Sequence, residues 1–263
     1  MTPARSSGAA RTLAETRLIF LRAMRLSLRN PVWVIIGLIQ PLLYLALFGP
    51  LLERVADAPG FPPGDAWQVF VPGLLVQLGI FGAAFVGFGL IAELRAGVVE
   101  RMRVTPASRL ALLLGRVLRE VVVLVVQAIL LVAAATAFGL RAPLWGIALG
   151  LAIVAVLAAA FSAASYAAAL RLKSEDALAP PLLNGLAIPV LLLSGILLPM
   201  SLAPGWLRTL ADVNPLKHVV DALRALYRGQ LATGDVVWGA IAAAGLLAAG
   251  LALATSAFRR ESS

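Results

Sequence analysis

Six long runs of apolar residues, none with a charged residue near its middle, constrain this chain more than any other feature of its sequence. A helix needs about 20 predominantly apolar residues to cross a bilayer, and every run is long enough. A transmembrane β-strand is shorter and alternates between apolar and polar positions, which these runs do not. The sequence therefore predicts an all-α integral membrane protein with six transmembrane helices. The expected spans are residues 32–52, 69–92, 121–140, 144–169, 178–198 and 236–257.

The composition agrees with this class and excludes several functions. Of the 263 residues, 61% are hydrophobic and 13% are charged, whereas a soluble domain has about 25% charged residues. The absence of cysteine and the single histidine, His218, exclude disulfides and a thiolate or His-rich metal site. The two lysines, Lys173 and Lys217, do not follow a glycine, so the Gly-Lys pair of a P-loop is absent. We expect no catalytic residue, metal or cofactor on this chain, and any ATP hydrolysis must come from a second polypeptide.

The basic residues indicate how the chain is oriented. Sixteen of the 22 Lys and Arg residues precede the first span, follow the second and fourth spans, or lie in the tail. Because positive residues favour the cytoplasmic side, both termini are predicted to be cytoplasmic. The net charge of +9 then reflects membrane topology, and we expect no binding of nucleic acid. The expected organisation is a cytoplasmic segment 1–31, one membrane domain 32–257 and a cytoplasmic tail 258–263.

The segment before the first span has the pattern of a basic amphipathic helix. On a helical wheel, four arginines between positions 11 and 29 fall within about 60° of one another, and Leu13, Phe20 and Met24 lie opposite. Asn30 and Pro31 end the pattern before the first span. Such a helix suits the lipid headgroup layer, with its arginines toward anionic lipid or a partner protein. The simpler alternative is a positively charged anchor with no specific contact.

The connection between the second and third spans carries the densest charge. After the polar residues that end the second span, Gly97 permits a turn, and a short amphipathic helix is expected over 98–104. Thr105 and Pro106 end this helix, because the residue before a proline avoids the helical conformation. Ser108 is a candidate cap for the helix that runs into the third span. The segment is either an ordinary charged loop or a rigid projection that another protein can push.

The connection between the fifth and sixth spans contains a second amphipathic helix. Asn214 suits the N-cap position, Pro215 the first helical position and Gly229 the end. Lys217, Asp221, Arg224 and Arg228 share one face within about 60°, with Lys217–Asp221 and Asp221–Arg224 spaced for ion pairs. This helix is expected on the outer membrane face, where it is either a lid over an exit path or packing over the span ends, with His218 as a surface residue.

Polar residues are sparse within the spans, and none of those near a span centre is ionisable. Ion-coupled carriers use ionisable groups at depth and a membrane hydrolase needs an acid–base pair, so both classes are disfavoured. A path for amphipathic molecules needs only an apolar and aromatic lining with a few hydrogen-bonding groups. Close helix packing is indicated by the small residues Gly79, Ala83 and Gly87 at four-residue spacing, and by Gly245 and Gly250 in the last span.

Two blocks of sequence resemble ABC transporter permeases of the type-2 class, which export drugs, lipids and polysaccharides. The first follows the pattern E-x-x-x-G-x-x-E-x-x-x-x-[ST]-P-x-[ST]-R, which this chain matches at Glu93, Gly97, Glu100, Thr105, Pro106, Ser108 and Arg109. The second is matched at Ser194-Gly195, Pro199, Pro204, Trp206-Leu207, Asn214-Pro215-Leu216, Asp221 and Arg224. The chain most resembles the multidrug and antibiotic-resistance branch, and the resemblance covers essentially its whole length.

The resemblance implies a role for each block. Coupling to an ATPase is implied for Glu93, Gly97, Glu100, Arg101, Arg103, Thr105, Pro106, Ser108 and Arg109. An extracellular gate or lid is implied at Pro199, Trp206, Asn214, Asp221 and Arg224. By analogy, spans 1, 2 and 5 line the path, with Gln40, Tyr44, Phe48, Gln77, Phe81, Phe85, Asn184 and Ser194 as candidates. Contacts between helices are the alternative role for each of these path residues.

The resemblance also implies the partners. Two copies of an ABC ATPase would carry ATP and Mg, and a second permease copy, most simply a homodimer, would complete the transport unit. The expected place is the inner membrane of a bacterial cell, and the expected cargo is a lipophilic drug or antibiotic. Three alternatives remain open: export of lipid or lipid-linked polysaccharide, a membrane anchor for an ATPase that transports nothing, and a channel or carrier independent of ATP.

Overall fold

The structure, a computed structural model, describes residues 8–30, 32–56, 61, 64–84, 86–95, 109–172, 188–196 and 199–260. Its elements are α1 (Gly8–Arg29), α2 (Val32–Val55), α3 (Ala66–Ala84), α4 (Val86–Arg95), α6 (Arg109–Ala137), α7 (Leu144–Leu172), α9 (Ile188–Leu193), the 3-10 helix η2 (Met200–Leu202), α10 (Gly205–Asp212), α11 (Pro215–Tyr227) and α12 (Gly234–Arg260). These residues contain helices and no strand, which confirms the all-α membrane fold.

In the part of the chain that the structure describes, five helical stretches are long and apolar enough to cross a membrane. They are Val34–Arg54, Ala66–Ile91, Leu110–Ala137, Leu144–Leu172 and Gly234–Ala257. The expected fifth span, 178–198, falls largely outside the described residues and shows only the six-residue helix α9, so the count of six stays a prediction. The third stretch ends at Ala137, three residues earlier than expected, because Gly139 turns the chain with a φ of 115°.

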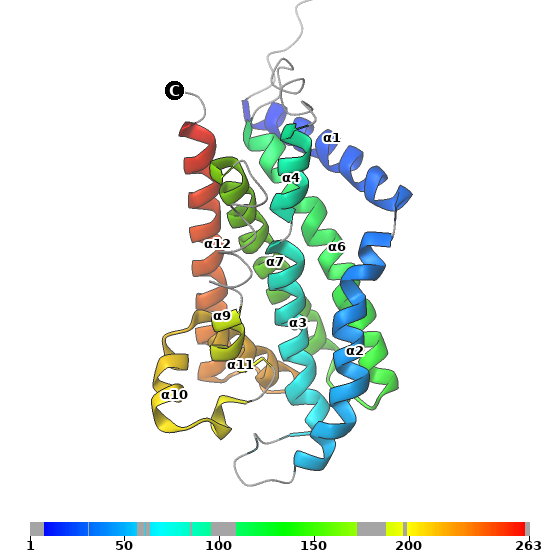
Figure 1. The fold of residues 1–263 in the computed structure, drawn as a ribbon, viewed down its shortest axis with the longest axis vertical. Coiled ribbons are helices and arrows are strands. Elements are labelled where there is room, and N and C mark those ends of the chain that lie inside the picture. Colours follow the sequence, from blue (N-terminus) through cyan, green and yellow to red (C-terminus); the bar gives the residue numbers. More distant parts are fainter. Residues whose placement is uncertain are drawn as a thin grey trace, which may run out of the picture.

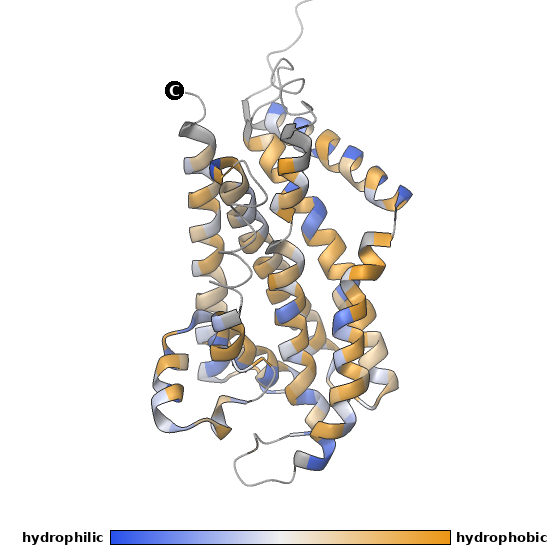
Figure 2. Ribbon diagram, viewed as in Figure 1, coloured by the Kyte–Doolittle hydropathy of each residue, from blue (hydrophilic) through white to orange (hydrophobic). Residues whose placement is uncertain are grey.

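The long helices run side by side, and the short ones gather at one end (Figure 1). Helix α1 lies across the end where α4, α7 and α12 finish and α6 begins, and α9, η2, α10 and α11 lie at the opposite end. Hydrophobic residues cover the long helices, while hydrophilic residues concentrate on α1 and near the two ends (Figure 2). The described basic residues of α1 and those of α11, which the sequence assigns to different sides of the membrane, therefore lie at opposite ends of the bundle.

Helix α3 forms the centre of the bundle. It packs against α2, α6, α7 and α11, and Leu74 and Leu75 are fully buried. Together with Leu157 of α7 and Leu223 of α11 they belong to the larger hydrophobic core, and a smaller core joins α4, α6, α7 and α12. Helices α2 and α12 lie at the edge, with large exposed apolar side chains such as Leu47. Exposed apolar side chains are expected where lipid replaces water.

The glycines of the expected packing stripes differ in their surroundings. Gly79 and Gly87 face α7, where their nearest neighbours include Leu157 and Ser165, so this stripe brings two helices close together as predicted. In α12, Gly250 lies against the backbone of α7, but Gly245 has no atom of the described residues within 4 Å of an added Cβ. Among the described residues, Gly245 therefore has no packing partner at its Cα, unlike Gly250.

Candidate functional site

Three residues expected to line a path form a continuous stripe on α2. Gln40, Tyr44 and Phe48 are each four residues apart and so stack on one side of the helix. The Gln40 amide donates to the Tyr44 hydroxyl over 3.5 Å, and the Tyr44 and Phe48 rings meet edge to face with centroids 5.6 Å apart. Gln40 and Phe48 are exposed and Tyr44 is half-buried. Aromatic faces beside hydrogen-bonding groups suit an amphipathic ligand.

Gln77 lies inside the bundle on α3, unlike the α2 stripe. It is 2% exposed, and its Oε1 accepts no hydrogen bond within the described structure. An unpaired buried oxygen of this kind lowers the stability of the fold by about 1–3 kcal/mol, so a hydrogen bond from a donor that reaches this oxygen is favourable. Phe81, one turn along α3, is half-buried. Two further path candidates, Phe85 and Asn184, lie outside the described residues.

Ser194, the last path candidate, occupies the turn that follows α9. It is fully buried, and its hydroxyl donates to the carbonyl oxygen of Leu191 at 2.8 Å. The hydroxyl is therefore satisfied within its own turn. Of the path candidates that the structure describes, the first three lie on α2, Gln77 and Phe81 lie on α3, and Ser194 lies in the turn after α9.

The expected coupling segment follows α4 and precedes α6 in the chain. Helix α4 ends at Arg95 and α6 begins at Arg109, directly after the expected cap, at the end of the bundle that α1 crosses (Figure 1). The side chains of Glu93 and Arg109 and the whole of Gly97, Glu100, Arg101, Arg103, Thr105, Pro106 and Ser108 lie outside the described part of the chain. Because the segment joins α4 to α6, a force applied to it acts on both helices.

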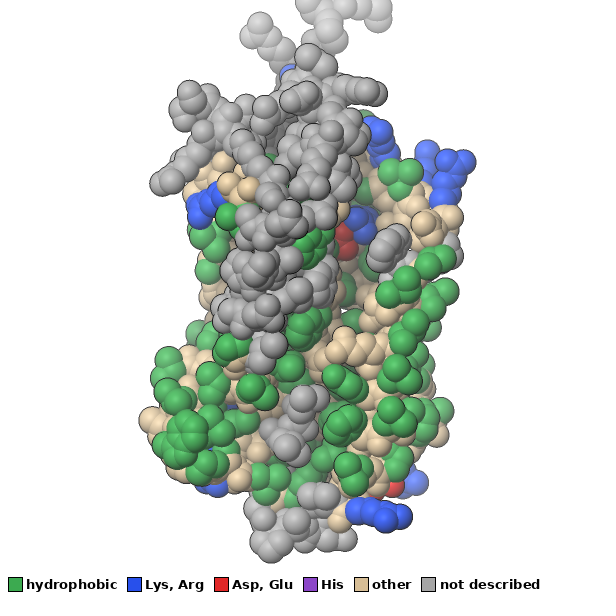
Figure 3. Space-filling view, in the orientation of Figure 1, with side chains coloured by type: hydrophobic (Ala, Val, Ile, Leu, Met, Phe, Trp, Pro, Cys, Tyr) green, Lys and Arg blue, Asp and Glu red, His purple; other side chains and the backbone are tan. Residues whose placement is uncertain are grey.

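Helix α1 is tied to the same helix α6 and exposes a basic face. The side chain of Ile19 packs against Gly115 of α6, where an added Cβ would lie 2.8 Å from it. The outward face forms an open groove of about 590 Å³ lined by Leu18, Leu21, Arg22, Arg25, Leu26, Leu28 and Arg29. Lys and Arg side chains are prominent in this region (Figure 3, upper right). Leucines thus share the arginine face, a mixture that suits a helix at a lipid–water boundary.

The element after α9 is fixed by the residues expected to form an outer gate. Asn214 caps α11: its Oδ1 accepts from the Leu216 amide at 3.0 Å, and its Nδ2 donates to the Val190 carbonyl of α9 at 3.3 Å. Pro215 and Gly229 occupy the first helical position and the turn after the helix, as predicted. Pro199 is buried, whereas the Trp206 side chain is 67% exposed.

Arg224 is not on an exposed charged face, contrary to the prediction. It is 4% exposed, because α11 is enclosed by α3, α7 and α12 and nine of its residues are buried. Its Nε donates to the Val69 carbonyl of α3 at 2.9 Å, and its Nη2 to the Gly195 carbonyl at 2.7 Å. Burial lowers the pKa of Arg224 to about 10 against the influence of Asp221, so the side chain is still charged at neutral pH.

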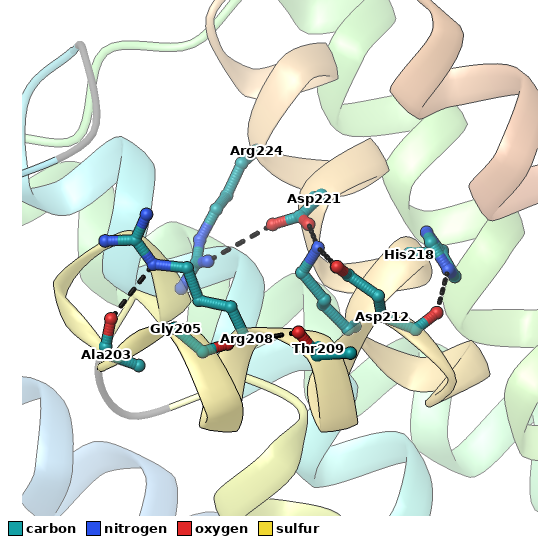
Figure 4. A network of polar contacts seen from close by, with 9 residues as sticks. Ala203, Gly205, Arg208, Thr209, Asp212, His218, Asp221 and Arg224 are labelled. Carbon is teal, nitrogen blue, oxygen red and sulfur yellow. Dashed lines mark hydrogen bonds and ion pairs between the residues drawn. The ribbon is translucent and has the colours of Figure 1, made fainter.

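A chain of charged contacts leads from Arg224 to the surface (Figure 4). Asp221 Oδ1 lies 3.5 Å from Arg224, and Lys217 Nζ lies 3.6 Å from Asp221 and 2.6 Å from Asp212. Both predicted pairs are present, and the Asp212 contact is additional. Burial lowers the pKa of Lys217, but the hydrogen bonds and charges of the two aspartates outweigh it and leave the pKa raised. The hydrogen bond from Lys217 and its charge lower the pKa of Asp212.

Gln127 and Trp67 make polar contacts between helices that were not predicted. The Gln127 amide of α6 donates to the carbonyl oxygen of Val34 in α2 at 2.8 Å. The indole Nε1 of Trp67 donates to Glu53 Oε1 at 2.6 Å, which joins α3 to α2. A single amide within an apolar run is the signal that marks Gln127, since such a group needs a partner in lipid. The Trp67 contact depends on a pairing of helices that the sequence does not specify.

An ion pair between a buried carboxylate and a half-buried arginine lies within the third candidate span. Glu120 is 5% exposed, and its Oε1 lies 2.6 Å from Arg119 Nη2. The sequence places both residues at the mouth of this span, but α6 begins at Arg109, and Glu120 follows it by about three helical turns. The pair neutralises a carboxylate that would otherwise be costly at this position.

Comparisons with known proteins decide the family. The model of the ABC-2 type transporter family matches residues 14–227. The chain belongs to this family. It is 27% identical over 264 residues to the daunorubicin resistance ABC transporter permease protein DrrB1 of Streptomyces coeruleorubidus, which covers 98% of this chain and 89% of that protein. It is also 27% identical to a ycf38 protein of Cyanophora paradoxa, named as a transport permease, over 76% of this chain and 69% of the relative.

This membership confirms the resemblance read from the sequence. The chain is a multi-pass membrane permease subunit of the ABC-2 type, in the branch that contains a drug-resistance permease. The match begins at residue 14, within α1, and ends at the last residue of α11. Both blocks quoted from the sequence therefore fall inside the family region.

Proposed function

We propose that this permease exports a lipophilic drug or antibiotic from the cytoplasm or the inner leaflet, driven by a separate ABC ATPase. The observation that carries the proposal is the similarity, over nearly the whole of both chains, to a permease named for daunorubicin resistance. The polar groups on and within the bundle are compatible with such a cargo. The stripe from Gln40 to Phe48 and the unpaired Gln77 oxygen offer aromatic contact and hydrogen bonding without a net charge.

The energy for transport enters at the end of the bundle that α1 crosses. Two ATPase copies dock under the 98–108 segment and α1, on a permease dimer in the bacterial inner membrane with cytoplasmic termini. Since the segment joins α4 to α6 and α1 packs on α6, closure of the ATPase pair moves these helices together. That movement changes the path from inward-facing to outward-facing. Helix α3, which continues toward α4, carries Gln77 and is packed against α11 at the other end.

The first test is copurification of the permease with a candidate ABC ATPase from the same organism, followed by ATPase rates with and without daunorubicin. Glu100→Ala and Arg101→Ala are expected to abolish stimulation by the drug. Arg171→Ala is the matched control, because Arg171 lies at the same end but bonds to Ser256 of α12 at 2.9 Å. If no ATPase associates with the permease, the proposal fails and an ATP-independent role takes its place.

Transport itself is measured in inside-out vesicles by the fluorescence of accumulated daunorubicin. ATP-dependent uptake that disappears with a hydrolysis-deficient ATPase supports drug export. Stimulation of the ATPase by lipid-linked polysaccharide, with no drug uptake, favours that cargo instead. An ATPase that binds the permease without vectorial movement of either cargo identifies a membrane anchor. Uptake without any ATPase identifies a channel or carrier.

A further inference from the structure

Arg224 joins three parts of the chain that are distant in sequence. It belongs to α11, and its guanidinium donates to Val69 of α3, 155 residues away, and to Gly195 in the turn after α9. Its third contact is Asp221, one turn earlier on α11. The planar guanidinium presents several donors in fixed directions, so one side chain holds two carbonyl groups at once.

The same junction contains a backbone contact that needs glycine. Gly73, one turn after Val69, lies against the carbonyl oxygen of Ile196, and a Cβ at this position would overlap with that oxygen. Helix α3 and the 194–196 turn therefore meet directly, and Arg224 bridges them from α11. Helices α9 and α11 lie at the end of the bundle opposite to α1, which is also the end where α3 begins (Figure 1).

The contacts of Arg224 have unequal consequences if the junction opens. Two of its partners are neutral carbonyl groups on other elements, which water replaces at low cost once the side chain is wetted. The third, Asp221, lies on the same helix and is partly exposed, so it moves with Arg224. The guanidinium can therefore adopt two arrangements. In one it is bonded to both carbonyl groups, and in the other water replaces them while the contact with Asp221 persists.

We propose that Arg224 is a positioning residue for transport, which keeps the outer end of the path closed by joining α11 to α3 and to the 194–196 turn. Release of cargo then requires the bonds to Val69 and Gly195 to break while the Asp221 contact persists. The role of Arg224 in cargo release rests on the proposed function. The closed junction itself is a property of this chain alone and is testable without an ATPase.

The absence of cysteine from the chain makes the test direct. Ile80, 6% exposed, lies about 10 Å further along α3 than Gly73, so Ile80→Cys reports on the interior below the junction. In membranes, its reaction with an impermeant maleimide added from outside is expected to be slow. Arg224→Met should raise this rate at least about tenfold, since loss of one bond to a charged group changes an equilibrium by about that factor. Arg224→Lys should give a smaller increase, because it keeps the charge and loses the fork.

Arg208→Met is the matched control. Arg208 is an exposed arginine of the same outer element, and it donates to the carbonyl oxygens of Ala203 and Ser201 within that element. It should leave the labelling rate unchanged. If Arg224→Met does not yield a folded protein, Gly73→Ala tests the same junction by steric displacement, with Gly79→Ala, which meets only ordinary contacts of 3.7 Å or more, as its control.

The outcomes separate the two proposals. Faster labelling in the Arg224 or Gly73 variants, with unchanged controls, supports the closed junction even if no ATPase is found. Labelling that does not change in these variants, or that occurs only from the cytoplasmic side, overturns it while leaving ATP-driven export intact. In vesicles with the ATPase, Arg224→Met should keep ATP hydrolysis but lose most net uptake, because an open outer end lets cargo return.

Discussion

A comparison of Gly87→Ala with Gly89→Ala tests whether close packing of α4 on α7 holds this bundle together. An added Cβ at Gly87 would lie 2.7 Å from both the carbonyl oxygen and the hydroxyl oxygen of Ser165, and 3.3 Å from Ala169 Cβ. The Gly87 amide also donates to that hydroxyl at 2.9 Å. At Gly89, on the same helix, an added Cβ meets no atom of the described residues within 4 Å.

The magnitude follows from these distances. Ordinary contact begins at 3.4 Å, so the methyl group at Gly87 is too close by about 0.7 Å, and the two helices must separate. Overpacking of this kind costs about 1–3 kcal/mol. Both substitutions gain the same helix propensity, about 1 kcal/mol, so the difference between the variants isolates the packing cost. Gly89→Ala should be more stable than the parent, and Gly87→Ala should be about 1–3 kcal/mol less stable than Gly89→Ala.

The assay is unfolding of the purified protein in mixed micelles by increasing SDS, followed by circular dichroism. A free energy of unfolding is fitted for the parent and both variants under one set of conditions. If the two variants shift by the same amount in the same direction, contact with α7 at Gly87 does not contribute to stability, and the packing argument fails.

Substitutions at three further polar residues, with their controls, probe contacts between elements, and the same unfolding assay measures each. Gln127→Leu should lower the free energy of unfolding by about 0.6–1.7 kcal/mol, because it removes the hydrogen bond from α6 to α2. Gln40→Leu, the control on α2, should leave stability unchanged and lower drug uptake. Equal stabilities of the two variants would contradict the α2–α6 bond. Asn214→Ala should lower the free energy of unfolding by about 1–2 kcal/mol. Asn214→Ser should lower it by less, because serine keeps the helix cap and loses only the bond to α9. Equal losses in the two variants would assign the whole effect to the α9 bond. Trp67→Phe should cost about 1 kcal/mol, because Glu53 is exposed and water partly replaces its bond; no loss would show that the bond is not needed.

The glycine stripes show where sequence reasoning was sufficient. Spacing of small residues identifies a helix face that can pack closely, and Gly79 and Gly87 do face α7. The same spacing cannot say whether a partner is present, because that depends on which helix lies alongside. Gly245 and Gly250 have similar surroundings in sequence, yet only Gly250 meets α7 within this chain.

Arg224 shows a limit of a different kind. On a helical wheel it groups with Lys217 and Asp221, which predicts an exposed charged face, and the local ion pairs of that face are present. A wheel describes one helix and contains no information about carbonyl groups on other helices. The bonds to Val69 and Gly195 compensate for the burial of the guanidinium, and they exist only after α3, α9 and α11 have assembled.

The sequence by itself determined the class of the protein, its helical membrane spans, the absence of a P-loop, the cap of α11 and the two blocks that identify the family. These features depend on local composition and on residues close together in the chain. Only the tertiary structure decided which polar groups are buried and paired, because burial depends on contacts between residues far apart in sequence. It placed Gln40 at the surface and Gln77 inside, and it turned Arg224 from a surface charge into a link between three helical elements.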